Sequence, residues 1–241
     1  MIFIIPTQAS PKAVGVSNWV FTEMANFRLI SGISNIGASN KVPLGLEFEL
    51  KDGWKIYWRN PGDAGYPPEI NFGNNENLSE IKWFWPAPKR FIFEDMQNFG
   101  YEKKIIFPIT ATVKTTKEPL VLQANITALA CKDICVPIDG DLNLTIPVGN
   151  PVKTEHAASI YSFEKRVPTK ANWPGFKILS VNANKNSILI TVKSKHPLIK
   201  PDVFIESENS FRFGKPEVSI SNNRLNASFI LSNDIPIDTN L

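Results

Sequence analysis

The chain has 241 residues, of which 43% are hydrophobic, so it can bury the cores of one or two domains. Its formal net charge is +3 and its Lys and Arg residues form no cluster, so charge does not indicate a nucleic-acid or membrane-surface partner. Frequent proline and the near absence of long helical periodicity are typical of an all-β or mostly β protein.

The N-terminus combines a short apolar run with small residues. Residues 1–5 are apolar, and Thr7-Gln8-Ala9-Ser10 resembles the end of a secretory signal, although a positively charged start is missing. We interpret residues 1–17 as an incomplete signal peptide or, alternatively, as a disordered or strand-forming segment. No later run approaches about 20 apolar residues, so a soluble mature chain without a membrane span is expected.

Residues 19–113 predict short strands separated by turns. Residues 19–30 contain the first strand, whose core candidates are hydrophobic: Phe21, Phe27, Leu29 and Ile30. Residues 42–50 alternate with period two, and one face carries large hydrophobic side chains: Leu44, Leu46, Phe48 and Leu50. The opposite face carries Gly45, Glu47 and Glu49. Further strands are expected at residues 54–58, 81–85 and 105–113.

The connections between these strands have characteristic turn residues. Lys51-Asp52-Gly53 predicts a turn in which Gly53 supplies a positive φ. Residues 59–68 are dense in Pro and Gly and predict a rigid loop, because Pro locks φ and Gly permits tight reversals. Residues 89–101 predict an aromatic loop, with Phe91, Phe93, Phe99 and Tyr101 as its rings.

The clearest pattern lies at residues 120–147. Its first arm alternates, with hydrophobic residues on one face: Leu122, Ala124, Ile126, Ala128 and Ala130. Its second arm alternates in the same way: Leu142, Leu144 and Ile146. Cys131 and Cys135 end these arms and would stand opposite each other across a three-residue turn. Cross-strand Cβ atoms lie about 4.5–5.5 Å apart, so these two cysteines, the only ones in the chain, are expected to form a disulfide.

Roughly seven short strands over about 130 residues predict an immunoglobulin-like β-sandwich at residues 18–150. Residues 151–174 are interpreted as a connector with a helix at 154–166, for which Thr154 is the N-cap and Pro168 the stop. Residues 175–241 predict a second β domain without cysteine, with strands at 176–181, 188–192, 203–206, 218–220 and 225–231. The chain ends without a closing strand, which would fit a truncated domain.

Few patterns of catalytic residues are present. His156 and His196 are far in sequence from any nucleophile candidate and are expected to face solvent. The sequence has no phosphate loop, HExxH, GxSxG or EF-hand motif, and two cysteines exclude a four-cysteine zinc site. Six tryptophans could form a carbohydrate platform, but Trp54 and Trp58 belong to an alternating strand and are expected in the core.

Two readings of the cysteine pair remain. As a structural staple that closes a loop of roughly five residues, it would contribute about 2 kcal/mol in the chain-entropy model. As a bridge beside a turn, it would be accessible and exchangeable, and it would provide one thiolate to attack and one to resolve a mixed disulfide. Lys132 favours a neighbouring thiolate and Asp133 opposes it, so the sequence leaves the thiol pKa open.

Four ordered motifs resemble the DsbD N-terminal (alpha) domain family, closest to the branch of ScsB-type suppressor of copper sensitivity proteins and their standalone relatives. The motifs are Gly53-Trp54-Lys55-Ile56-Tyr57-Trp58-Arg59-Asn60-Pro61-Gly62-Asp63-Ala64-Gly65-Tyr66-Pro67-Pro68, Trp85-Pro86-Ala87-Pro88-Lys89-Arg90-Phe91, Gly100-Tyr101 and Cys131-Lys132-Asp133-Ile134-Cys135-Val136-Pro137. The resemblance covers residues 18–148. It implies an immunoglobulin-like periplasmic module that passes reducing equivalents from a membrane-embedded partner to oxidised thioredoxin-fold proteins.

The resemblance also implies roles for individual residues. Cys131 and Cys135 match the redox pair, with Cys135 forming the mixed disulfide and Cys131 resolving it. The best-known members have more than three residues between these cysteines, which leaves that order open. An aromatic cap loop covers the cysteines in the family, and residues 89–101 correspond to it, with Phe91, Phe93 or Phe99 as the shielding ring or, alternatively, as ordinary core residues. DsbD continues into a transmembrane domain and a thioredoxin domain, which this chain lacks.

Three hypotheses follow. The first is a periplasmic protein-disulfide oxidoreductase that cycles Cys131 and Cys135 between dithiol and disulfide and needs no organic cofactor. The second is Cu(I) capture by the two thiolates with help from Met96, since soft sulfur ligands select Cu(I) and the resembling branch is linked to copper tolerance. The third is an interaction module that the disulfide only staples.

Overall fold

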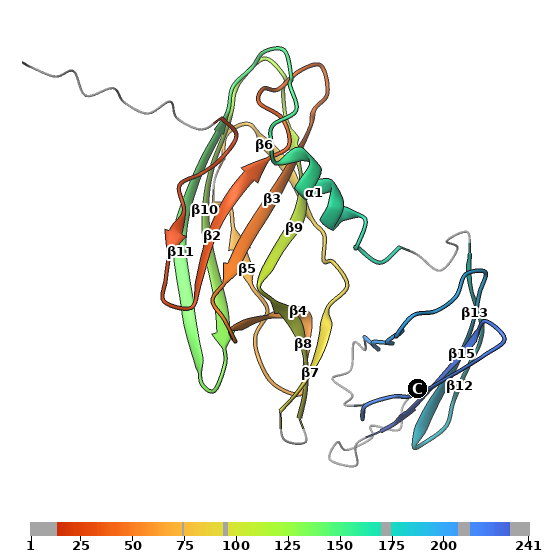
Figure 1. Ribbon diagram of the computed structural model, residues 1–241. Helices are drawn as coiled ribbons and strands as arrows, with labels where there is room; N and C mark the ends of the chain where they lie inside the picture. Colours follow the sequence, from red (N-terminus) through yellow and green to blue (C-terminus); the bar gives the residue numbers. More distant parts are fainter. Residues whose placement is uncertain (1–13, 74, 94–95, 170–174, 207–212, 232–241) are drawn as a thin grey trace, which may run out of the picture. The chain divides into compact units, whose positions relative to one another are not determined.

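The computed structural model describes residues 14–73, 75–93, 96–169, 175–206 and 213–231 (Figure 1). Its contacts divide the chain into two compact units. The first unit comprises Met1–Ile56, Pro68–Pro86 and Tyr101–Val167, and the second comprises Tyr57–Pro67, Ala87–Gly100 and Pro168–Leu241. The expected signal peptide lies mostly in residues 1–13, outside the described residues. The boundaries expected at residues 17, 150 and 174 stay predictions.

One antiparallel sheet of the first unit has the order β1-β2-β3-β9-β6. Its strands are β1 (Val20–Phe21), β2 (Ala25–Ser31), β3 (Lys41–Leu50), β6 (Leu78–Trp83) and β9 (Lys104–Val113). The inward side chains are those that alternate in the sequence, because successive residues of a strand point to opposite faces. Phe27, Phe48 and Phe107 are fully buried, and their rings lie 5.3 and 6.1 Å apart in series.

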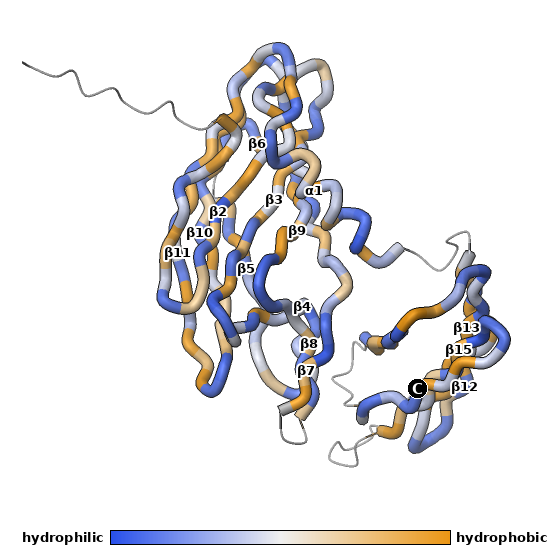
Figure 2. The backbone as a smooth tube through the Cα atoms, in the orientation of Figure 1, coloured by the Kyte–Doolittle hydropathy of each residue, from blue (hydrophilic) through white to orange (hydrophobic). Residues whose placement is uncertain are grey.

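The other sheet of the first unit is built on the long hairpin of β10 (Leu120–Cys131) and β11 (Cys135–Ile146). β10 also pairs with β5 (Glu69–Asn71) and, through Cys131 and Lys55, with the start of β4 (Lys55–Gly62). Figure 2 shows hydrophobic and hydrophilic residues alternating along β10 and β11. The inner faces of the two sheets form one core, as expected for an immunoglobulin-like sandwich.

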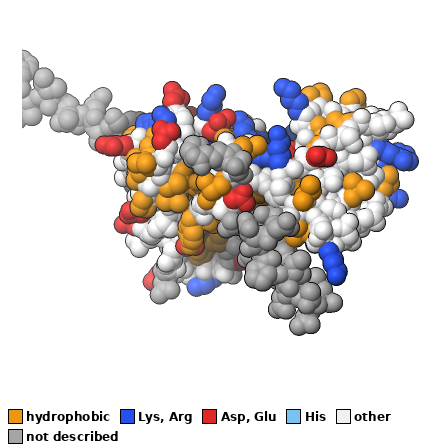
Figure 3. Space-filling model, turned by 90° about the horizontal axis from the view of Figure 1, so that it is seen from below, with side chains coloured by type: hydrophobic (Ala, Val, Ile, Leu, Met, Phe, Trp, Pro, Cys, Tyr) orange, Lys and Arg blue, Asp and Glu red, His pale blue; other side chains and the backbone are white. Residues whose placement is uncertain are grey.

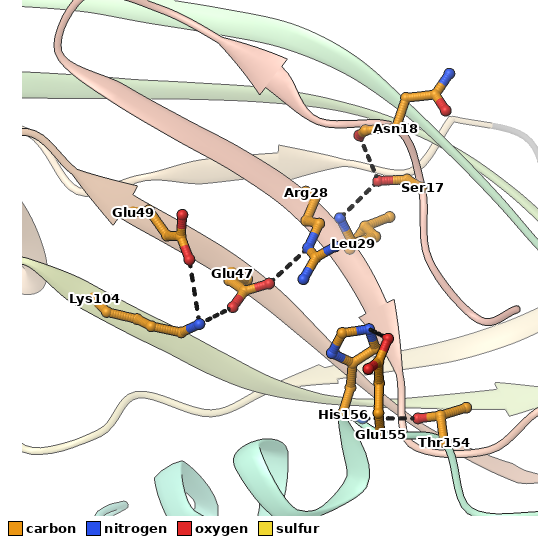
Figure 4. Close-up of polar contacts among 10 residues, drawn as sticks. All are labelled: Ser17, Asn18, Arg28, Leu29, Glu47, Glu49, Lys104, Thr154, Glu155 and His156. Atoms are coloured by element: carbon orange, nitrogen blue, oxygen red, sulfur yellow. Dashed lines mark hydrogen bonds and ion pairs between the residues drawn. The ribbon is translucent and has the colours of Figure 1, made fainter. Parts of the chain in front are cut away.

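Helix α1 (Ala157–Glu164) covers the outer face of β3 and β9 (Figure 1). Its one buried residue, Ile160, packs against Ile30 and Ile106. Beside it, Glu47 is 1% exposed and contacts Arg28 at 2.7 Å and Lys104 at 2.5 Å (Figure 4). Of the two glutamates on the outer face of β3, Glu47 is therefore buried and paired with Arg28 and Lys104, whereas Glu49 stays 45% exposed.

Several predicted details of the first unit are wrong. Residues 19–30 form two short strands instead of one, and Phe21 is 72% exposed because it lies in the edge strand β1. The helix is shorter than predicted, and His156 rather than Thr154 is its N-cap. Thr154 donates its hydroxyl to the carbonyl of Ser31, which anchors the preceding turn to β2.

The second unit contains a hairpin and a separate sheet. β7 (Lys89–Phe93) and β8 (Met96–Glu102) pair in the hairpin, and β8 also lies next to β4. The sheet has the order β12-β13-β15-β14, with β12 (Phe176–Ala183), β13 (Ser187–Ser194), β14 (Glu217–Ser221) and β15 (Arg224–Ile230). Its core is formed by Leu225, Ala227 and Phe229. A second β domain was expected here, and the structure confirms four of its five strands.

The remaining predictions for the second unit need correction. The aromatic loop predicted at residues 89–101 is the β7–β8 hairpin. The rigid loop predicted at residues 59–68 begins later, because β4 extends to Gly62. Residues 203–206 are not in a strand. Across the described ranges, no helix is both long and apolar enough to cross a membrane.

Candidate functional site

Cys131 and Cys135 form a disulfide at the turn end of the β10–β11 hairpin. The register pairs Leu120 with Ile146 and continues without interruption to Cys131 opposite Cys135, whose Cα atoms are 4.1 Å apart. Period-two burial along both strands excludes a slip of one residue, which would turn every hydrophobic side chain to the outer face, and the three-residue turn fixes the register. The predicted pairing of the cysteines is confirmed.

The two cysteines differ in their exposure. Cys131 is 3% exposed and lies between two strands, opposite Cys135 on one side and Lys55 of β4 on the other. Cys135 is exposed at the start of β11, which is an edge strand. The exposed residue of the pair is therefore Cys135, and the buried residue is Cys131.

The three turn residues between the cysteines are exposed. Ile134 is 67% exposed and presents an apolar surface directly beside Cys135. The Lys132 side chain lies over Gly53 of the β3–β4 turn, where an added Cβ would come within 2.8 Å of its Cε. Gly53 has the predicted positive φ, +83°. Seen from the end of the molecule at which the β10–β11 turn lies, hydrophobic side chains gather among acidic ones (Figure 3).

The three candidate cap residues lie in the β7–β8 hairpin. Phe91 pairs with Asn98 across the hairpin and is partly exposed. Phe99 is 7% exposed, and its ring contacts that of Phe204 at a centroid distance of 5.1 Å. Phe93 ends β7, and its side chain is not among those that the structure describes. Their role as a cap over the cysteines stays a prediction.

The other candidates from the sequence take no part in this site. His196 is exposed, as predicted, but His156 is not: it is the N-cap residue of α1, and only 12% of its side chain is exposed. Burial and the nearby Arg28 charge lower the pKa of His156 (Figure 4). Trp58 is 3% exposed, as expected of a core residue, and Met96 begins β8 in the second unit.

The described residues include no group of three or more His, Cys, Asp or Glu side chains that could hold a metal ion. Arg90 and residues 202–206 are not candidate functional residues by their sequence pattern, yet in the structure Arg90 contacts Asp202, Val203 and Phe204. Arg90 falls within one of the four resembling motifs, but its partners are more than 100 residues away in sequence and no local pattern indicates them.

Comparison with known proteins gives two family matches. Residues 31–147 match the family described as thiol:disulfide interchange protein DsbD, N-terminal. Residues 166–239 match a domain of unknown function, DUF8393. A comparison with curated proteins gave no match.

Two solved structures are similar to the chain. The crystal structure of the N-terminal periplasmic domain of ScsB from Proteus mirabilis has a TM-score of 0.76 and 22% sequence identity, covering 92% of this chain and 87% of that one. This likeness shows a shared fold. The crystal structure of the Neisseria meningitidis DsbD N-terminal domain in the reduced form has a TM-score of 0.26 and 15% identity, covering 54% of this chain and 90% of that one.

Proposed function

Residues 31–147 belong to the DsbD N-terminal family of thiol:disulfide interchange domains, and from this we propose that the chain passes reducing equivalents through Cys131 and Cys135. The electrons come from a membrane-embedded donor of the DsbD or ScsB type and go to oxidised thioredoxin-fold proteins. The periplasm is the proposed compartment, in keeping with the periplasmic domain whose fold the chain shares.

The observation that carries this proposal is the unequal exposure of a bonded cysteine pair. A disulfide that served only as a staple would not need one accessible sulfur. Here Cys135 is exposed at a turn and Cys131 is buried behind it. Disulfides that are accessible are the ones that exchange.

The forward reaction has two steps. The Cys135 thiolate attacks one sulfur of the partner's disulfide, so that a bond to Cys135 forms, the partner's own bond breaks, and the leaving sulfur takes up a proton. The Cys131 thiolate then attacks the sulfur of Cys135, which closes the disulfide and releases the partner's second thiol. The partner gains two electrons and the chain loses two. A dithiol donor reverses both steps.

The direct test is to trap the mixed disulfide. Reduced Cys131→Ser protein, mixed with an oxidised thioredoxin-fold protein, is expected to accumulate a one-to-one conjugate because Cys135 attacks and no thiol resolves the product. Non-reducing electrophoresis measures the conjugate, and added dithiothreitol should release it.

The matched control is Cys135→Ser, which leaves only the buried thiol of Cys131. We expect at least tenfold less conjugate from this variant over the same time. Equal trapping by both variants would contradict the order of attack, and no trapping by either would contradict the exchange function. A Cu(I) titration of the reduced protein tests the copper alternative, which requires stoichiometric binding that Cys131→Ser abolishes.

A further inference from the structure

Lys55 is the residue opposite Cys131 on the side of β10 that faces away from Cys135. It begins β4, and the antiparallel register pairs it directly with Cys131. Residues opposite each other in such a pair have their Cβ atoms about 4.5–5.5 Å apart on the same face of the sheet. Both residues belong to the first unit. A lysine side chain therefore starts directly beside the buried cysteine.

The other charged residues at this end of the hairpin balance one another. Four of them lie in two turns: Lys132 and Asp133 between the cysteines, and Lys51 and Asp52 between β3 and β4. All four are exposed, so water screens their charges, and each turn carries one charge of each sign. β10 has no charged residue, and the first one of β11 is Asp139, four residues beyond Cys135. Lys55 is the half-buried cation that remains.

Burial makes the charged form of Cys131 costly. Only 3% of this residue is exposed, so little water is available to stabilise a thiolate there. A positive charge a few ångströms away has the opposite effect, because it favours the anion. The charge of Lys55 is screened less than the charges in the two turns, since Lys55 is itself half-buried.

The thiolate of Cys131 occurs in both directions of the proposed exchange. When a donor thiolate attacks the sulfur of Cys135, a bond between the donor and Cys135 forms, the Cys131–Cys135 bond breaks, and its electron pair stays on Cys131. In the other direction, the Cys131 thiolate attacks the sulfur of Cys135 and releases the partner's thiolate. A thiol with a lower pKa leaves faster, and a larger thiolate fraction speeds its attack.

We propose that Lys55 stabilises the thiolate of Cys131 and thereby speeds both the opening and the closing of the Cys131–Cys135 disulfide. The kinetic part rests on the proposed function. Lys55 acts through Cys131, so it is a positioning residue. It lies within the motif at residues 53–68, whose Pro/Gly-rich part forms a loop and whose lysine is given a role by this pairing.

The first test titrates Cys131 in the Cys135→Ser protein, where it is the only thiol. Ultraviolet absorbance follows the thiolate, and the variant without either cysteine gives the background. Addition of Lys55→Met, which keeps an apolar stem and removes the charge, is expected to raise the pKa of the Cys131 thiol by about 1. Lys55→Arg keeps the charge and should leave that pKa unchanged. Lys51→Met, which removes the same charge from the exposed β3–β4 turn, is the matched control and should also leave it unchanged.

The second test measures reduction of the disulfide by dithiothreitol in the protein with both cysteines. Lys55→Met is expected to slow it about threefold, because the leaving thiolate loses its counter-charge. Lys55→Arg and Lys51→Met should react at the wild-type rate. A general loss of positive charge would instead slow the attack of anionic dithiothreitol equally in Lys51→Met and Lys55→Met.

The outcomes separate this inference from the proposed function. An unchanged pKa of the Cys131 thiol in Lys55→Met would overturn the inference, whether or not the chain exchanges thiols with a partner. Equal effects of Lys51→Met and Lys55→Met would also overturn it, since net charge and not the pairing would then act. A raised pKa with an unchanged reduction rate would overturn the kinetic part. A raised pKa together with a failed trapping experiment would contradict the proposed function and support the electrostatic role. If Lys55→Met fails to fold, Lys55→Gln takes its place with the same expectations.

Discussion

Glu47 illustrates how a single carboxylate can stay charged within this sandwich. Burial raises the pKa of Glu47, but the hydrogen bonds and charges of Lys104 and Arg28 outweigh that effect, and the pKa is lowered from its ordinary value of 4.5. Lys104 also contacts Glu49 at 3.3 Å, so it bridges two carboxylates of β3. The carboxylate therefore stabilises the folded state in its charged form.

Glu47→Gln should destabilise the protein at pH 7 by about 2–3 kcal/mol, because Arg28, whose side chain is 17% exposed, loses its counter-charge. The wild-type contribution is complete above pH 4.5 and is lost as the pH falls through the lower folded pKa. The difference between wild type and variant should thus shrink in acid. Urea unfolding at pH 7 and pH 3.5 measures it.

Glu49→Gln is the control for this prediction, because Glu49 is 45% exposed and its contact with Lys104, at 3.3 Å, is screened by water. Its effect should stay within about 0.5 kcal/mol at both pH values. A Glu47→Gln effect that is equally small would mean that the buried ion pair contributes nothing to stability.

The loop that follows β4 depends on glycine at a specific position. Gly65 has a φ of +114°, and a Cβ there would overlap the ring of Tyr57. Tyr57 is itself 3% exposed and cannot move away without disturbing the packing around it. The Pro/Gly-rich sequence predicts a rigid loop here, and the structure supplies the reason at Gly65.

Gly65→Ala should destabilise the protein by about 2–4 kcal/mol, which combines backbone strain with displacement of a buried ring. Gly73→Ala is the matched control, because Gly73 also has a positive φ of +55° but has nothing within 4 Å of an added Cβ. It should cost only about 1 kcal/mol. Thermal unfolding of both variants makes the comparison, and equal losses would show that the Tyr57 contact has no effect.

At the scale of the whole molecule, the disulfide closes a loop of only a few residues within a sandwich that has an extensive core of its own. The chain-entropy model assigns such a loop about 2 kcal/mol. The large buried aromatic and aliphatic side chains of both sheets do not depend on that contribution. The folded state is therefore expected to persist when the two thiols are reduced, as the proposed redox cycle requires.

If the Cys131–Cys135 pair exchanges as proposed, its reduction potential should lie around −180 to −270 mV, within the range of known exchangeable dithiols. Equilibration with glutathione and dithiothreitol buffers measures it, and far-UV circular dichroism of the reduced protein checks that the fold persists. A value below about −300 mV would mark a structural bridge and contradict the exchange function.

The sequence by itself determined the elements whose pattern is local. Alternation along residues 120–146 predicts the two strands, and the three-residue turn between them predicts the pairing of Cys131 with Cys135. The same reasoning predicts the inner faces of β3 and β9. Four ordered motifs between residues 53 and 137 also resemble the family whose model residues 31–147 match.

Only the tertiary structure decided which of these residues is reachable and what holds the surrounding elements. Cys131 is buried because β4 lies beside it, and Phe21 is exposed because β1 is an edge. Residues 203–206 have the composition of a strand, but they lie against Arg90 and Trp58 instead. These outcomes depend on partners far away in the chain, and local hydrophobic periodicity carries no information about which distant segments will meet.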